Sequence, residues 1–110
     1  MAEDFKRLAK VRLQSTPTLI YEAPAAPTEV QAIIKAIFVN NVSGAQTSVT
    51  MWQGGSGDSD VLLNPTTLEA GEYGTWDGGA LTVDAADSLY GQCSQDDGVT
   101  VIVEGLEVSV

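Results

Sequence analysis

The sequence predicts an all-β protein, an antiparallel β-sandwich of the jelly-roll kind. Short segments rich in β-branched and aromatic residues recur every eight to twelve residues or so, with turn residues between them. No segment after the N-terminus carries a helical pattern that outweighs this spacing. The connections are also too short for the crossover helices that parallel strands require, which favours antiparallel pairing in two sheets.

The longest apolar segment, Val30 to Asn41, predicts a central strand. Successive side chains of a strand point to opposite faces, so this segment divides into two sets. One set is entirely apolar and is expected to face the core: Val30, Ala32, Ile34, Ala36 and Phe38. The other set is apolar with one charge, and we expect part of it to be buried by self-association through Ile33, Lys35, Ile37 and Val39.

A helix is the alternative for the same segment. Val30, Ile33, Ile34, Ile37 and Phe38 also fit a helical stripe, and Thr28 with Gln31 imitates a capping box. Against the helix, many of these residues are β-branched, and such side chains fit a pleated surface better. The turn chemistry that follows at residues 40–44 also favours a strand that ends in a hairpin.

The rest of the chain predicts further short strands. They are expected near residues 18–22, 46–53, 61–63, 72–76, 80–83, 88–94, 99–103 and 106–108. Asn64-Pro65 is expected to end the strand before it, and Asp96-Asp97-Gly98 predicts a hairpin turn. Gly105 predicts a β-bulge before the last strand segment.

The charge is unevenly distributed along the 110 residues, whose net charge is −10. Residues 1–12 hold four cations and two acids, a net charge of +2, while residues 13–110 hold one cation and thirteen acids, a net charge of −12. We therefore divide the chain into an extended or partly helical N-terminal arm, 1–16, and a sandwich domain, 17–110. The arm is expected to bind an acidic protein partner or a neighbouring copy through Phe5, Lys6, Arg7, Leu8, Lys10 and Arg12. A frayed, solvated terminus is the alternative.

The acidic body argues against binding to nucleic acid or to anionic membranes. No apolar run is long enough to cross a bilayer, and the N-terminus has no continuous hydrophobic stretch of the kind found in signal peptides. The single cysteine, Cys93, excludes an internal disulfide and is expected in the core. These features predict a protein that folds in a cytosol.

The residues needed for common catalytic sites are missing from the sequence. Histidine is absent, which removes the usual general base and the commonest metal ligand. The paired acids Asp84 with Asp87, and Asp96 with Asp97, fall in turns, where Asp is favoured for local hydrogen bonding rather than catalysis. We therefore expect no enzyme activity, catalytic residue, cofactor or metal site.

Two weaker binding hypotheses accompany this expectation. Asp58 and Asp60 are oxygen donors of the kind that calcium prefers, although their spacing matches no EF-hand loop. Trp52 and Trp76 could form a sugar-stacking platform beside the Gly-rich loop at residues 54–57, but a tryptophan near a strand end more often packs in a core or an interface.

Several strand ends and turns resemble those of small virion proteins of tailed bacteriophages. The matching segments are TLIYEAP, IFVNN followed by Ser-Gly, Leu68-Glu69-Ala70-Gly71-Glu72 and LTVDAADSLYGQCS. Ala86 stands where that pattern has glycine. The resemblance covers about residues 17–105 and implies a β-sandwich structural protein.

The resemblance implies a virion component made in the host cytoplasm. It implies a homo-oligomer bound to the capsid or the tail and does not say which. Our preferred hypothesis is a capsid decoration (cement) protein, with a trimer favoured over a dimer, that binds the major capsid protein or another virion protein. The alternative is a tail or head-tail accessory protein with a receptor- or carbohydrate-binding role.

Overall fold

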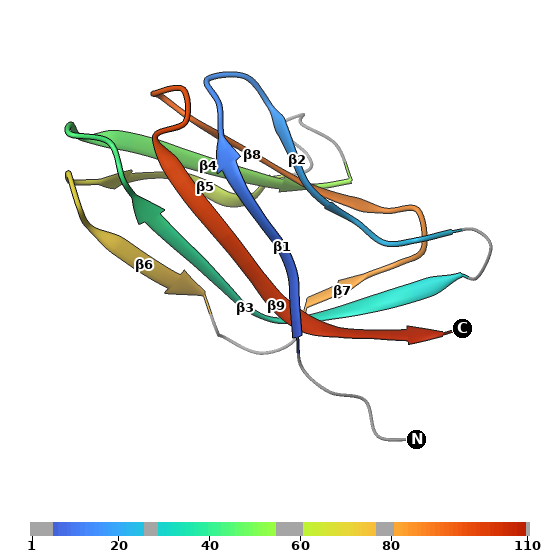
Figure 1. Cartoon of the computed structure of the whole chain (residues 1–110). Coiled ribbons are helices and arrows are strands. Elements are labelled where there is room, and N and C mark those ends of the chain that lie inside the picture. The colour runs from blue at the N-terminus through green and yellow to red at the C-terminus, as the bar shows by residue number, and fades with distance from the viewer. Residues whose placement is uncertain (1–5, 26–28, 55–60, 77–80, 110) are drawn as a thin grey trace.

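The computed structural model describes residues 6–25, 29–54, 61–76 and 81–109, and within these ranges the chain is all β, with no helix (Figure 1). The strands are β1 (Lys6–Leu13), β2 (Thr18–Glu22), β3 (Val30–Asn41), β4 (Thr47–Gln53), β5 (Val61–Leu68), β6 (Tyr73–Trp76), β7 (Leu81–Val83), β8 (Ser88–Cys93) and β9 (Val99–Ser109). The predicted fold class is confirmed, and so is the choice of strand over helix for residues 30–41.

The strands form two antiparallel sheets that pack face to face (Figure 1). Sheet A has the order β1-β9-β3-β6, and β7 pairs with an earlier part of β3 than β6 does, on the edge of β3 that β9 does not occupy. Sheet B has the order β2-β8-β4-β5. The long strands β3 and β9 pair along almost their whole length and form the centre of sheet A.

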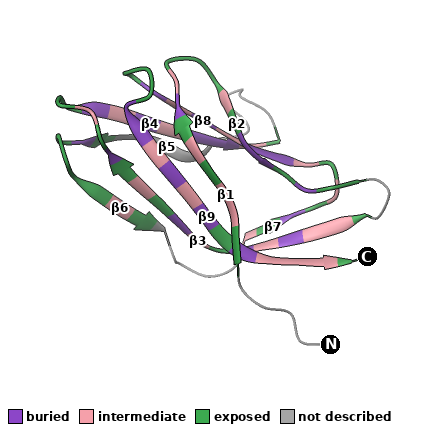
Figure 2. Cartoon of the chain, in the orientation of Figure 1, coloured by how far each residue is buried: buried purple, intermediate pink, exposed green. Residues whose placement is uncertain are grey.

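The core lies between the sheets, and in the long strands it is built largely from alternate residues (Figure 2). β9 contributes the predicted row Val99, Val101 and Val103, all fully buried, and β8 contributes Leu89 and Cys93. The other buried members of the core cluster are Leu13, Ile20, Tyr21, Ala23, Ala32, Ile34, Ile37, Val49, Met51, Leu68 and Val83. Removal of this apolar surface from water is the main force that holds the sheets together.

A β-bulge in β3 overturns part of the predicted division into faces. The register between β3 and β9 skips Lys35, because Ile34 pairs with Gly105 and the next pair is Ala36 with Glu104. One extra residue shifts the alternation, since the side-chain period of a strand is two. Beyond the bulge the inward residues are therefore Ile37, Val39 and Asn41, and the outward ones are Ala36, Phe38 and Asn40. Gly105, where the sequence predicted a bulge in β9, lies opposite this one.

The predicted N-terminal arm is also corrected. Residues 6–13 form neither a helix nor a detached segment, but the edge strand β1 of sheet A, which pairs with β9 from Lys6 to Leu13. Alternate residues of β1 are apolar and face the core: Leu13 is fully buried, and Ala9 and Val11 pack against the core cluster. The sandwich therefore includes residues 6–13, which lie within the segment expected to be an arm.

Strand β5 is longer than predicted, because Asn64-Pro65 does not end it. The register with β4 jumps from Met51–Leu63 to Val49–Thr66, so Asn64 and Pro65 lie in an irregular part of the ladder. β5 is an edge strand of sheet B. Edges and bulges are the places where a sheet accepts proline, which cannot donate a backbone hydrogen bond.

Three turns meet at one end of the sandwich, and Asn41 joins two of them. Its side chain is fully buried, and Nδ2 donates to the carbonyl oxygens of Ala45, Leu68 and Glu69 at 2.8, 3.0 and 3.0 Å. The third turn is attached through the backbone of Val42, whose N–H donates to the Gly98 carbonyl at 2.9 Å. The β3–β4, β5–β6 and β8–β9 turns are thus held together at one end of the sandwich (Figure 1).

Candidate interaction surface

The outer face of sheet A is the main candidate for a binding surface. The residues that line it are those of β1, β9, β3 and β6 that point away from the core. The strand register places them in rows: Arg12, Thr100, Asn40 and Tyr73; then Lys10, Ile102, Phe38 and Thr75; then Arg7, Glu104 and Ala36; and finally Leu106 with Ile33. We call this set the sheet A face.

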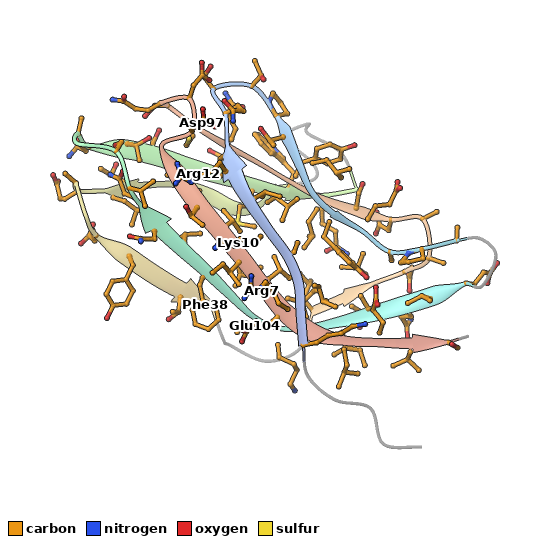
Figure 3. The ribbon with its side chains drawn as sticks, viewed as in Figure 1. Arg7, Lys10, Arg12, Phe38, Asp97 and Glu104 are labelled. Carbon is orange, nitrogen blue, oxygen red and sulfur yellow. The ribbon has the colours of Figure 1, made fainter. Side chains whose placement is uncertain are left out.

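The β1 side of the sheet A face is cationic. Arg7, Lys10 and Arg12 are exposed and follow one another along β1 (Figure 3). Lys10 lies opposite Ile102, an uncharged neighbour, and Arg7 lies opposite Glu104. Among the described residues, neither Arg7 nor Lys10 has a carboxylate within ion-pair distance. Their charge is therefore available to a partner, although cations on an edge strand also discourage unwanted strand pairing.

The centre of the sheet A face is apolar. Phe38 is 38% exposed and lies in register between Ile102 of β9 and Thr75 of β6. Ile33 and Leu106 extend the apolar strip beyond the bulge and are half-buried. Exposed apolar side chains beside a row of charges are the composition expected of a surface that binds another protein.

Lys6 differs from the other cations of β1, because its ammonium group is engaged within the sandwich. Its Nζ lies 3.0 Å from Oε1 of Glu107, and the Tyr21 hydroxyl donates to the other carboxylate oxygen, Oε2, at 2.5 Å. These contacts link β1, β2 and β9 at the open side of the sandwich. The hydrogen bond from Tyr21, followed by the contact with Lys6, lowers the pKa of Glu107.

Arg12 and the β1–β2 turn are fixed to the β8–β9 turn. Arg12 Nη1 donates to the Asp97 carbonyl oxygen at 3.1 Å, and Gln14 Nε2 donates to Asp97 Oδ1 at 2.7 Å. The Ser15 N–H donates to Asp96 Oδ1 at 2.7 Å, which lowers the pKa of Asp96. Both acids thus make turn contacts, as expected, and Asp97 has a positive φ of 58°.

The predicted self-association set is divided by the bulge. Ile33 is half-buried on the sheet A face, and Lys35 is exposed at the bulge. The other two members were placed on the wrong face, because Ile37 is 4% exposed in the core and Val39 packs against it. The sequence interpretation missed Phe38, which is exposed on the sheet A face. The available signal was the alternation in β9, where Thr100, Ile102 and Glu104 alternate with the apolar row that faces the core.

The predicted partner set lies mostly on or beside the sheet A face. Arg7, Lys10 and Arg12 belong to it, whereas Leu8 is half-buried and packs against the core. Phe5 lies outside the described residues. The positions of Asp58 and Asp60, the weakly considered calcium ligands, lie outside them as well.

The remaining sequence candidates occupy structural positions. Asp84 and Asp87 form a turn in which the Asp87 N–H donates to the Asp84 carbonyl at 2.9 Å, and Asp84 also accepts from Gln31 Nε2. Cys93 is 2% exposed, and its Sγ donates to the Gln95 carbonyl at 2.8 Å. No set of three or more acidic or cysteine side chains close enough to hold a metal occurs in the part of the chain that the structure describes.

Trp52 does not form an exposed platform, because it is only 8% exposed. It lies outside the main core cluster and pairs in register with Tyr90 of β8. The side chain of Trp76 lies outside the described part of the structure, although its backbone ends β6. The sugar-stacking hypothesis thus loses one of its two aromatic rings.

No family model matches the sequence, and no curated protein matches it. Among solved structures, the fold is similar to a chain of the Bacillus endospore appendages, described as a novel family of disulfide-linked pili. The TM-score is 0.54, with 13% identity, over 99% of this chain and 88% of that chain. At this identity the likeness establishes the β fold alone. Within the described residues, no helix is long and apolar enough to cross a membrane.

Proposed function

We propose that this chain is a structural protein of a tailed-bacteriophage virion that works by binding other proteins and transforms no substrate. Its preferred form is a capsid decoration protein that binds the shell as a homo-oligomer. The sheet A face is the observation that carries this proposal, because Arg7 and Lys10 stand beside an exposed apolar strip on the same sheet. A tail or head-tail accessory role remains the alternative.

Two further features support the proposal. The turn and strand-end motifs resemble those of small phage virion proteins, and Asn41, which ends one motif, proves to be the buried residue that joins two turns. The fold is also compatible with assembly, since the Bacillus appendage chain of similar fold belongs to pili. Disulfide linkage does not carry over to this chain, because Cys93 is the only cysteine and is buried.

The mechanism is the addition of many weak contacts. A decoration protein present in many copies gains avidity from simultaneous binding, even where each contact buries little area. Arg7 and Lys10 would bind acidic side chains of a neighbouring protein in the particle, either a virion protein or another copy of this chain, and Phe38 would bury apolar surface beside them. The electrostatic part of this binding weakens as salt rises.

Deletion of residues 1–12 is not a clean test, because it removes most of strand β1 and would impair folding. Arg7→Gln/Lys10→Gln removes two charges and keeps the strand. The matched control, Thr16→Glu/Ala25→Asp, lowers the net charge by the same two units at exposed positions off the sheet A face.

The measurement is the number of copies in purified phage particles, determined by quantitative mass spectrometry and located by electron microscopy. We expect wild-type protein and the control on the particle, and at least a severalfold lower occupancy for Arg7→Gln/Lys10→Gln. Absence of the wild-type protein from particles would refute the proposed function. Full occupancy of the double variant would refute the role of the β1 cations.

A further inference from the structure

The turns at one end of the sandwich form a surface opposite in charge to the sheet A face. Glu69 and Glu72 of the β5–β6 turn and Asp96 and Asp97 of the β8–β9 turn are all exposed. Val42 of the β3–β4 turn lies among them, held to Gly98 by its backbone N–H, and is 45% exposed. We call these five residues the acidic end: Val42, Glu69, Glu72, Asp96 and Asp97.

We propose that the acidic end of one copy docks on the sheet A face of a second copy. Charge complementarity identifies the occupant, because the acids of one copy meet Arg7 and Lys10 of the next. The apolar parts also match, with Val42 against Phe38 and Ile102. This inference rests on the proposed function and names the partner of the same surface.

Face-to-face pairing of two sheet A faces is disfavoured by charge. The outward residues of β1 and β9 comprise three cations, Arg7, Lys10 and Arg12, and a single carboxylate, Glu104. Two such faces brought together would set cations against cations, which is costly where water is excluded. An end-on-face contact avoids this, because the two surfaces differ in sign.

The geometry of this contact determines the kind of assembly. Two different surfaces of the chain meet, so the contact is heterologous, and its repetition gives a closed ring or an open filament. Where each copy docks on a different neighbour, the smallest closed ring is a trimer, whereas two copies close by docking reciprocally, each end on the other face. The trimer is the form expected for the phage virion proteins.

The contact area suggests that a single contact is weak. The molecule measures 44 × 27 × 22 Å along its principal axes. One end therefore covers on the order of 500 Å² on each copy, less than the roughly 800 Å² per partner of a standard stable interface. Ring closure gives every copy two contacts and converts weak pairing into a stable oligomer.

The test uses two variants, each defective in one surface. In the face variant, Lys10→Gln/Phe38→Ser, the acidic end is intact. The end variant is Glu69→Gln/Glu72→Gln. Its amide oxygens can still accept the two turn hydrogen bonds, one from Gln46 Nε2 to residue 69 and one from the N–H of residue 69 to residue 72. The control is Glu22→Gln/Glu29→Gln, which makes the same charge change near the other end of β3.

The mass of the purified proteins is measured by sedimentation velocity across a concentration series. We expect wild type and the control to associate, and each defective variant to associate at least about tenfold more weakly, as expected for a lost pair of complementary charges. An equal mixture of the two variants should form a 1:1 dimer that does not grow, because only one complementary pair of surfaces remains. Association should also weaken at high salt.

Three results would overturn the inference: a monomeric wild type at every concentration, undiminished association of the end variant alone, or no dimer in the mixture. If either double variant fails to fold by circular dichroism, Lys10→Gln and Val42→Lys replace them, since both alter exposed side chains only. A protein that is monomeric in solution but still binds particles would refute this inference without contradicting the proposed function. A protein that forms rings but is absent from particles would refute the proposed function without contradicting this inference.

Discussion

The hydroxyl of Tyr21 donates a 2.5 Å hydrogen bond to Oε2 of Glu107, across the gap between sheet B and sheet A. Tyr21 is 8% exposed, and its partner also contacts Nζ of Lys6 at 3.0 Å. Strand β2 is thereby tied by a side-chain contact to β9 and β1, strands with which it shares no backbone ladder. This cluster closes the open side of the sandwich where the edge strands of the two sheets approach each other.

Removal of the Tyr21 hydroxyl should therefore destabilise the fold. Tyr21→Phe keeps the ring in the core and leaves the Glu107 carboxylate with one fewer donor, so we expect the free energy of unfolding to fall by about 1–2 kcal/mol. Urea unfolding at neutral pH measures this loss. Tyr73→Phe is the matched control, since Tyr73 is 74% exposed, and an equal loss in both variants would contradict the role of the hydrogen bond.

The same pair predicts a pH dependence. The pKa of Glu107 is lowered in the folded protein, chiefly by the Tyr21 hydrogen bond. The ionised Glu107 carboxylate therefore stabilises the fold at pH values above the ordinary glutamate pKa. This stabilisation is lost as the pH falls through the lower pKa of the folded state. The pKa of Tyr21 is raised, first by burial and then by Glu107. The protonated Tyr21 hydroxyl therefore stabilises the fold up to the ordinary tyrosine pKa, and this stabilisation is lost only as the pH rises above it. The difference in stability between wild type and Tyr21→Phe should thus be constant near neutral pH and shrink below about pH 4. A difference that grows on acidification would contradict this assignment.

Asn41 should be one of the most sensitive polar positions in the chain. Its Nδ2 donates to three carbonyl oxygens, and its Oδ1 accepts from the N–H and hydroxyl of Ser43 at 3.0 and 2.7 Å. Asn41→Ala leaves these buried or half-buried groups without partners, and we expect a loss of about 2–4 kcal/mol in the free energy of unfolding. Asn40→Ala, at the exposed neighbouring position, should change it by less than about 0.5 kcal/mol. Similar thermal unfolding midpoints for the two variants would disprove this assignment.

The fold class was predictable because it depends on features that repeat along the sequence. Turn residues at short intervals and alternating rows such as Val99, Val101 and Val103 are read without knowledge of the pairing. The strand order, in contrast, depends on long-range contacts. β1 was taken for an arm because its cations were weighed more heavily than the alternation of Ala9, Val11 and Leu13 with them, the pattern that signals a half-buried strand.

The binding face was harder to predict because of one residue. Lys35 is the extra residue of the β3 bulge. Before and after it, the residues that point to either face of the strand are mostly apolar. Hydrophobicity alone therefore could not reveal that the alternation changes phase there, which carries Phe38 outward and Ile37 inward. The close approach of Gly105 opposite the bulge and the positive φ of Ala86 in a turn allow such exceptions to be tested.

Gly105 is required by the close approach of β9 to β3 beside this bulge. A Cβ atom at this position would collide with the carbonyl oxygen of Ile33, and the Cα of Ile34 lies 3.0 Å from the same point. Because both are backbone atoms, Gly105→Ala forces the two central strands of sheet A apart. We expect a loss of about 3 kcal/mol in the free energy of unfolding. Gly44→Ala is the control, since no atom lies within 4 Å of its added Cβ; equal urea midpoints would rule out the close approach.

Ala86 occupies the left-handed region, with a φ of 66°, in the turn between β7 and β8. Its N–H donates to the Ala23 carbonyl at 2.8 Å, so the conformation is fixed by the neighbouring connection after β2. Alanine has a steric cost in the left-handed region that glycine avoids. This steric cost is larger than the free energy that glycine loses through the greater conformational entropy of its unfolded chain. Ala86→Gly should therefore raise the free energy of unfolding by about 0.5–1 kcal/mol. Ala85→Gly, at the adjacent residue without a positive φ, should lower it instead. Thermal unfolding of the two variants gives the sign of each change, and destabilisation by both would show that the turn relaxes to another conformation in solution.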